Sequence, residues 1–174
     1  MKKCLIVVDY QQDFVTGSLG FAGAEALDGR IAARIADYRA EGGDVLFTMD
    51  THRTDYLAKQ EGRKLPVPHC IEGTSGHALY GAVGKAKKDG DRAFCKGTFG
   101  SDELYAFLRE NSYGQIEFAG VVSNICVISN VVLAKTAQPE TEIVVDAALT
   151  ASNDKNLHEA ALKVMESLQV TVKR

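Results

Sequence analysis

The sequence predicts a three-layer α/β/α fold built around a parallel sheet. Short, continuously apolar segments recur along the chain, and most of them are followed by a segment with helical spacing of apolar residues. Strands that are apolar on both faces are typical of parallel sheets that helices cover on both sides. The chain has 174 residues, of which 45% are hydrophobic and 25% charged, so we expect one domain with a buried core over residues 1–174.

The first half of the chain contains three of the predicted strands. Residues 4–8, 44–49 and 92–95 are apolar runs of strand length. Residues 27–38 carry apolar side chains at helical spacing, and two glycines after this segment end the helix. Prolines and glycines cluster in residues 51–90, so we expect most of that segment to be loop.

The second half continues the alternation, and Ser101 is a suitable N-cap for its first helix. In order, the predicted elements are helix 101–108, strand 116–122, helix 125–135, strand 142–145, helix 157–168 and strand 170–172. Ligands of such sheets bind beyond the carboxyl ends of the strands, so the residues that follow the strands are the first candidates for a site.

Composition and charge exclude several classes of function. The formal net charge of −3 provides no basic excess for binding nucleic acid or an anionic membrane. The N-terminus does not resemble a signal peptide, and no apolar run is long enough to span a bilayer. The four cysteines form no C-x-x-C pair and no compact disulfide framework. We therefore expect a cytoplasmic protein whose cysteines act as individual thiols.

Reactive side chains follow four of the predicted strands. Asp9, Asp50 and Lys96 each come directly after an apolar strand, and Cys126 lies a few residues past another. Because the carboxyl ends of parallel strands meet at one edge of the sheet, these four groups are predicted to converge there.

Cys126 is the candidate nucleophile, since it is predicted in the first turn of a helix, where the helix dipole favours a thiolate. Lys96 would favour the thiolate further, and Asp9 would accept and return the proton. The alternative is that Cys126 is a small buried hydrophobic residue, which we prefer for Cys4 and Cys95 inside their strands. Asp9 and Lys96, taken singly, would be a capping carboxylate and a solvated lysine.

The ordered motifs resemble the isochorismatase-like cysteine hydrolases over essentially the whole chain. They are Asp-Tyr-Gln-Gln-Asp-Phe at 9–14, Asp-Thr-His at 50–52, Lys-Gly at 96–97, and Gly-Val-Val-Ser-Asn-Ile-Cys-Val at 120–127. Each motif alone is weak, but the set in this order and spacing is specific. The resemblance implies a catalytic triad of Asp9, Lys96 and Cys126, and a six-stranded sheet in the order 3-2-1-4-5-6.

The same resemblance implies a cis peptide bond between Val121 and Val122. Its implied role is to direct the N–H of Val122, together with that of Cys126, at the oxyanion that develops during the reaction. Asn124 departs from the aspartate usual in the family, and Ser123 from a frequent threonine. Both replacements keep hydrogen-bonding ability, so we expect altered local tuning and retained activity.

A metal site is the second predicted feature of this sheet edge. Asp50 and His52 share one side of an extended segment, and Glu61 and His69 follow in the loop. Two imidazoles with one or two carboxylates suit Zn²⁺, Fe²⁺ or Mn²⁺, although spacing alone leaves these histidines equally well explained as ordinary loop residues. The resemblance to nicotinamidases implies that Asp50, His52, Glu61 and His69 bind one divalent transition metal, with zinc favoured.

The resemblance also implies a substrate, nicotinamide, hydrolysed to nicotinate and ammonia in NAD salvage. The metal would hold the pyridine nitrogen, which turns the carboxamide carbon toward Cys126. Phe14 would flank the ring, although core packing explains it equally well, and Leu19 and Tyr105 are further candidate contacts. His77 stands where many relatives carry a tryptophan.

Two other functions are compatible with these motifs. The first is a related amidase that acts on an open-chain or ureido amide without a functional metal. The second is a non-enzymatic binding module, which the presence of all three triad residues disfavours. A small-molecule amide is the expected partner in either enzymatic case, and a homo-oligomer is compatible with the sequence.

Overall fold

The structure is a computed structural model that describes residues 1–174, and its centre is a six-stranded sheet. All strand pairs are parallel, and the strand order is β3-β2-β1-β4-β5-β6, as predicted. The strands are β1 (Lys3–Val8), β2 (Asp44–Asp50), β3 (Ala93–Lys96), β4 (Gln115–Val121), β5 (Glu142–Ala151) and β6 (Thr171–Lys173).

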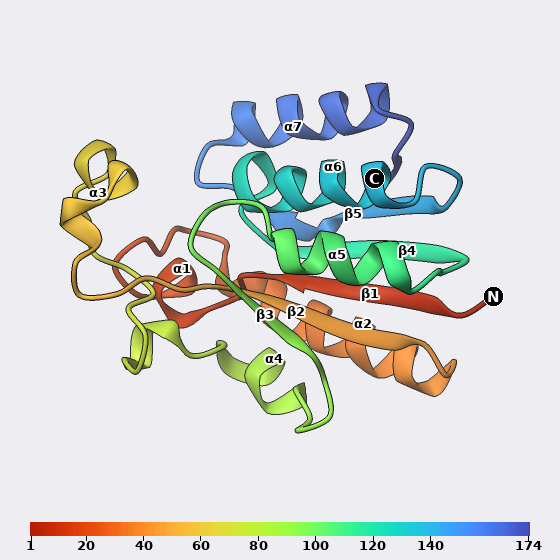
Figure 1. Cartoon of the computed structure of the whole chain (residues 1–174), viewed down its shortest axis with the longest axis horizontal. Helices are drawn as coiled ribbons and strands as arrows, with labels where there is room; N and C mark the ends of the chain where they lie inside the picture. The colour runs from red at the N-terminus through yellow and green to blue at the C-terminus, as the bar shows by residue number, and fades with distance from the viewer.

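Helices cover both faces of this sheet, which confirms the predicted three layers. As Figure 1 shows, α5, α6 and α7 lie on one face, whereas α2 and α4 lie on the other. None of the helices combines the length and the hydropathy that crossing a membrane requires. The helices are α1 (Gln12–Val15), α2 (Asp28–Ala40), α3 (Gln60–Lys64), α4 (Gly81–Ala86), α5 (Asp102–Glu110), α6 (Ile128–Ala137) and α7 (Lys155–Ser167). Three 3₁₀ turns accompany them, at Glu25–Leu27, Tyr56–Ala58 and Ser75–His77.

The central strand β1 divides its side chains between two hydrophobic cores. Cys4, Ile6 and Val8 point into the core beneath α5, α6 and α7, and Leu5 and Val7 point into the core beneath α2. Successive side chains of a strand point to opposite faces, so a strand between two helical layers must be apolar throughout. This is why the strands appear in the sequence as unbroken apolar runs.

Residues 51–90 are mostly loop, as predicted, although they also contain α3 and α4, which are too short to show a helical period in the sequence. One part of the structure differs from the prediction. Strand β5 extends to Ala151 instead of ending at Val145. The register between β4 and β5 shifts after Phe118, and small and polar residues interrupt the apolar run of β5 at that point.

The carboxyl ends of β1 and β4 approach each other closely, and Gly120 permits this. Gly120 has φ +110°, and a Cβ atom at this position would lie 2.0 Å from the carbonyl oxygen of Val8. Only glycine accepts both the backbone conformation and the contact. The close approach brings Asp9, which follows β1, next to the segment that follows β4.

Candidate active site

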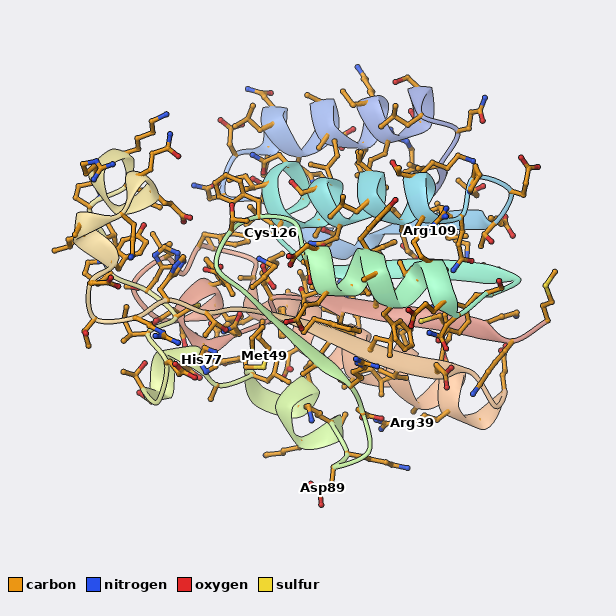
Figure 2. The ribbon with its side chains drawn as sticks, viewed as in Figure 1. Arg39, Met49, His77, Asp89, Arg109 and Cys126 are labelled. Carbon is orange, nitrogen blue, oxygen red and sulfur yellow. The ribbon has the colours of Figure 1, made fainter.

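The predicted triad residues converge beyond the carboxyl ends of the strands. Asp9 follows β1, Lys96 is the last residue of β3, and Cys126 lies in the segment between β4 and α6. Lys96 Nζ is 2.6 Å from Asp9 Oδ2 and 3.6 Å from Cys126 Sγ. Figure 2 shows Cys126 at the beginning of α6, whereas Arg109 lies near the opposite end of this helical layer. The ammonium group therefore stands between the carboxylate and the sulfur.

Hydrogen bonds with neighbouring groups hold the side chains of Asp9 and Lys96 in place. Thr48 Oγ1 donates a hydrogen bond to Asp9 Oδ1 at 2.6 Å, and Lys96 Nζ donates to the carbonyl of Thr98 at 2.9 Å. Asp50 Oδ1 lies 3.7 Å from Lys96 Nζ. Asp9, Thr48, Lys96 and Asp50 are all buried. The charges of Asp9, Asp50 and Lys96 therefore interact more strongly than they would in water, although burial raises the pKa of the Asp9 carboxyl.

The protonation state of the sulfur differs from the prediction. Burial and the carboxylate of Asp9 raise the pKa of Cys126 well above the ordinary thiol value, although Lys96 lowers it in part. Burial alone would lower the pKa of Lys96, but Asp9 raises it above the ordinary lysine value. The resting cluster therefore contains a neutral thiol beside an Asp9–Lys96 ion pair. The helix dipole does not suffice for a resting thiolate, because Cys126 is buried next to a carboxylate.

Cys126 lies in a π-helical turn, Ser123–Val127, and not in a regular first turn of α6. The peptide bond between Val121 and Val122 is cis, as the sequence motif implied. The carbonyl of Val122 accepts hydrogen bonds from the N–H groups of Ile125 and Val127, at 3.1 and 3.2 Å. Single π-helical turns occur frequently at functional sites, so this geometry is consistent with a nucleophile placed by its backbone.

The predicted metal ligands gather beside the triad. Asp50, His52 and His69 are buried, and one ligand atom from each lies within 4.8 Å of the others. Asp50 Oδ2 is 3.0 Å from His52 Nε2 and 3.2 Å from His69 Nε2. Glu61 is more distant, because its Oε1 lies 3.8 Å from His52 Nε2 and 3.7 Å from His69 Nε2. Glu61 is also the most exposed of the four, at 21% of its side chain.

This donor set fits a divalent transition metal. His69 Nδ1 lies 2.8 Å from the carbonyl of Val67, which leaves Nε2 as the nitrogen that faces Asp50. His52 Nε2 is buried and makes no well-directed hydrogen bond, although a carboxylate oxygen is 3.0 Å away. A buried imidazole nitrogen that faces carboxylate oxygens without a hydrogen bond is consistent with a metal site, and two imidazoles with carboxylates suit zinc or iron.

Two side chains that the sequence motifs contained, but to which we assigned no role, hold this region in place. Gln11 is fully buried and bonds both backbone groups of Asp50: its Oε1 accepts from the N–H, and its Nε2 donates to the C=O. Asp13 Oδ2 accepts from the N–H of Cys70, directly after His69, at 2.8 Å. The sequence feature that could have identified both residues is their position in the motif that begins at Asp9.

A cavity of about 230 Å³ connects the sulfur with the metal-ligand cluster. Cys126, Asp50, Glu61 and His69 all contribute to its wall. The remaining lining residues are Phe14, Leu19, Phe21, Leu65, Phe99, Val122, Ile125 and Asn153. Pockets for drug-sized ligands span about 300–1,000 Å³, so this cavity suits a smaller and largely apolar molecule.

The predicted pocket residues differ in how they are placed. Phe14 and Leu19 line the cavity, and the Phe14 ring lies 5.5 Å from the His69 ring. Tyr105, also predicted as a substrate contact, does not line it and packs against the core beneath α5, because the first turn of α5 directs it there. His77 does not line it either, and its Nε2 lies 2.8 Å from Thr51 Oγ1.

The other cysteines are placed as follows. Cys4 is buried in β1, as expected. Cys95, also expected to be buried, is exposed, because β3 is an edge strand and this side chain points away from the core. Cys70 follows His69 in the chain, is buried and does not line the cavity. Burial and the carboxylate of Asp50 raise the pKa of this thiol. Cys126 is therefore the one cysteine that faces the cavity.

Comparisons with known proteins identify the family to which this chain is similar. A model of the isochorismatase domain matches residues 3–173. An isochorismatase family protein, PncA of Bacillus subtilis (strain 168), is 30% identical over 143 residues, which cover 76% of this chain and 78% of that protein. The crystal structure of the nicotinamidase/pyrazinamidase PncA from Bacillus subtilis matches with a TM-score of 0.88 and 30% identity, and covers 100% of both chains.

A second solved structure, the pyrazinamidase of Pyrococcus horikoshii in complex with zinc, matches with a TM-score of 0.87. The match covers 100% of this chain and 99% of that chain, at 22% identity. At this level of identity the likeness shows a shared fold.

Proposed function

We propose, since this chain belongs to the isochorismatase family, that it is a nicotinamidase, which hydrolyses nicotinamide to nicotinate and ammonia. One observation carries the proposal: the nucleophile and the metal-ligand cluster line the same small cavity. Cys126, Asp50, Glu61 and His69 all line this cavity. A ring held at the metal side would present a substituent to the sulfur, which is the geometry that a pyridine carboxamide needs.

The first chemical step is acyl transfer to the enzyme. Asp9 accepts the thiol proton as Cys126 Sγ attacks the amide carbon, so a thiolate forms only with the substrate in place. Lys96 stays protonated between the two groups and stabilises the negative charge as it moves from Asp9 to the sulfur. Asp9 then gives the proton to the amide nitrogen, the C–N bond breaks, and ammonia leaves a thioester on Cys126.

The second step returns the enzyme to its resting state. A water molecule attacks the thioester carbonyl while Asp9 accepts one of its protons. The C–S bond breaks, nicotinate leaves, and Asp9 returns the proton to the sulfur. The neutral resting thiol that the raised pKa of Cys126 requires is thereby restored.

The oxyanion that forms in both steps needs hydrogen-bond donors on the cavity wall. The backbone N–H groups of Val122 and Cys126 are the proposed donors, since both residues line the cavity at the π-helical turn. The loss of one such donor typically slows a reaction by about a hundred- to a thousandfold.

Asp50, His52, Glu61 and His69 are the residues that would hold a divalent metal, and zinc is our preferred ion. The bound ion would supply a Lewis-acidic ligand position for the pyridine nitrogen, which fixes the ring. Phe14 and Leu19 would pack on the ring faces and exclude water. Orientation of this kind accounts for a large part of many enzymatic rate enhancements.

The test is the release of ammonia from nicotinamide by the wild type and by two cysteine variants. Cys126→Ala should abolish turnover, because no other thiol faces the cavity. Cys95→Ala, which removes an exposed thiol on β3, is the matched control and should retain full activity. Full activity of Cys126→Ala would refute the nucleophile assignment, and a wild type that leaves nicotinamide intact would refute the substrate.

A ureido amidase without a functional metal is the alternative. Elemental analysis of the purified protein separates the two enzymes, because the alternative requires neither a bound transition metal nor sensitivity to chelators. The converging ligand atoms of Asp50, His52 and His69, together with the unpaired Nε2 of His52, favour the nicotinamidase. A nicotinamidase would act in NAD salvage in the cytoplasm.

A further inference from the structure

The π-helical turn that carries the nucleophile is attached to the rest of the protein at both ends. Asn130, on α6, donates from Nδ2 to the carbonyl of Cys126 at 2.8 Å, and its Oδ1 accepts from the N–H of Ser101. At the other end, Ser123 Oγ lies 2.9 Å from Nδ1 of His158, on α7. The sulfur end and the Val122 end of the turn therefore have separate attachments.

The contact between His158 and Ser123 is needed for a physical reason. Ser123 is fully buried, so its hydroxyl has no access to solvent, and His158 is the side chain that provides a hydrogen-bond partner. A buried hydroxyl without a hydrogen-bond partner is destabilising, and a single π-helical turn is a rare backbone conformation. The first residue of the turn thus depends on α7 to stay in place.

The position of Ser123 makes this attachment relevant to the chemistry. Ser123 follows Val122 directly, and Val122 lines the cavity. The carbonyl of Val122 is already fixed by the N–H groups of Ile125 and Val127 within the turn. Because this carbonyl belongs to the peptide unit that joins Val122 to Ser123, a displacement of Ser123 would shift that unit and Val122 with it, whereas Asn130 would still hold the carbonyl of Cys126.

We propose that His158 is a positioning residue for the oxyanion site: through Ser123 it holds Val122, and with it the proposed oxyanion donor, in the orientation that the reaction needs. No local sequence pattern predicts this role, because His158 and Ser123 are 35 positions apart in the chain. The structure has His158 half-buried, between α7 and the turn. The inference rests on the proposed function only in taking Val122 as an oxyanion donor.

Two reactions at the same sulfur separate this role from a general loss of structure. With p-nitrophenyl acetate, the Cys126 S–C bond forms, the C–O bond to p-nitrophenolate breaks, the thiol proton passes to Asp9, and the carbonyl oxygen becomes a transient oxyanion. With iodoacetamide, the thiol proton again passes to Asp9, an S–C bond forms, the C–I bond breaks and iodide leaves, without any carbonyl oxyanion. Only the first reaction needs the oxyanion donors.

The experiment measures both rates in a Cys95→Ala background, which removes the exposed thiol. We expect His158→Ala to slow acylation by p-nitrophenyl acetate about ten- to a hundredfold, and to change alkylation by iodoacetamide less than twofold. His158→Asn, which keeps an amide atom near the position of Nδ1, should recover most of the acylation rate. Glu159→Ala, the neighbouring exposed residue on α7 that pairs with Arg174, should change neither rate.

Ser123→Ala removes the same contact from its other end and should reproduce the effect of His158→Ala. The double variant should be no slower than either single variant, since the two residues act through one hydrogen bond. Ser123→Ala also provides the answer if thermal unfolding shows that His158→Ala does not fold. An unchanged acylation rate in the folded variants, or an equal fall of both rates, would overturn the proposal.

The outcomes also separate this inference from the proposed function. A wild type that is acylated at Cys126 but leaves nicotinamide intact would refute the substrate and leave the role of His158 open to the same comparison of rates. A nicotinamidase in which His158→Ala leaves acylation unchanged would refute the role of His158 alone.

Discussion

The triad and the metal-ligand cluster lie side by side, but the chain builds them in different ways. Asp9 and Lys96 adjoin the ends of β1 and β3, strands whose backbones are fixed by parallel pairing. His69 and Glu61 belong to the segment between β2 and β3. In Figure 1, the part of this segment that forms α3 lies away from the sheet. The sheet positions the first group, whereas individual side-chain hydrogen bonds position much of the second.

This difference predicts how each region responds to substitution. Sheet register is shared among many hydrogen bonds, so single substitutions in the strands, away from the reacting groups and from the π-helical turn, should leave the chemistry of the triad intact. The metal-ligand cluster depends on single contacts such as the one from Asp13 to the backbone of Cys70. One substitution at such a contact should weaken metal binding without affecting the sulfur.

The largest effect is expected for Asp9→Asn. An amide cannot accept the thiol proton, so turnover of nicotinamide should fall by about a thousandfold. Metal content should stay at the wild-type level, because the ligands of the metal-ligand cluster are untouched. Ammonia release and elemental analysis measure the two quantities, and Asp37→Asn, on the exposed side of α2, is the control. A loss of metal in Asp9→Asn would show that the two regions are not independent.

Gly120→Ala tests the sheet itself. A Cβ atom would meet the carbonyl of Val8, and φ is +110°, so the free energy of unfolding should fall by at least about 3 kcal/mol. Gly29→Ala, in α2, has open space around the new methyl group and should raise it by about 0.5–1 kcal/mol. Denaturant unfolding measures both variants. Equal free energies of unfolding for the two variants would contradict the view that strand geometry holds the triad in place.

The metal ligands should rank by distance. His69→Ala removes a buried ligand and should lower metal affinity by at least about a hundredfold, whereas Glu61→Gln should lower it by about tenfold. In both variants KM for nicotinamide should rise more than kcat falls, because the ring is held less well. Metal titration against a competing chelator gives the affinities, and the reverse ranking would contradict the assignment of Glu61 as the weaker ligand.

Asp13→Ala tests the indirect support of the cluster. It leaves the N–H of Cys70 unpaired and frees the loop that carries His69, so metal affinity should fall by about tenfold. Asp13→Asn keeps an acceptor oxygen and should have a smaller effect. The rate at which iodoacetamide alkylates Cys126 should match the wild type in both variants, and a changed rate would show that this loop also supports the triad.

The smallest effect concerns pH. Burial and Asp9 hold the pKa of Cys126 above the ordinary thiol value, and only the thiolate reacts with iodoacetamide. Below its pKa the thiolate fraction rises tenfold for each pH unit, so the alkylation rate should rise throughout pH 7–9 without levelling off. Mass spectrometry of the Cys126 peptide follows the reaction. A plateau near pH 7 would show that Cys126 is a thiolate at rest, as the sequence predicted.

The sequence by itself determined the sheet and the residues at its edge. Apolar runs such as residues 4–8 must be strands buried on both faces, and polar residues directly after them must meet at one edge. Asp9, Asp50 and Lys96 could therefore be placed together from local pattern alone. The strand order came from the resemblance to a family, since no local pattern specifies which strands are neighbours.

Only the tertiary structure decided the groups whose neighbours are distant in the chain. Periodicity could not show that Tyr105 packs into the core, that Cys95 faces outward, or that His158 reaches Ser123, 35 residues away. The protonation of Cys126 was likewise decided by burial and by Asp9. Burial, electrostatic interaction and hydrogen bonding depend on distance in space, whereas sequence patterns report only what a residue shares with its neighbours along the chain.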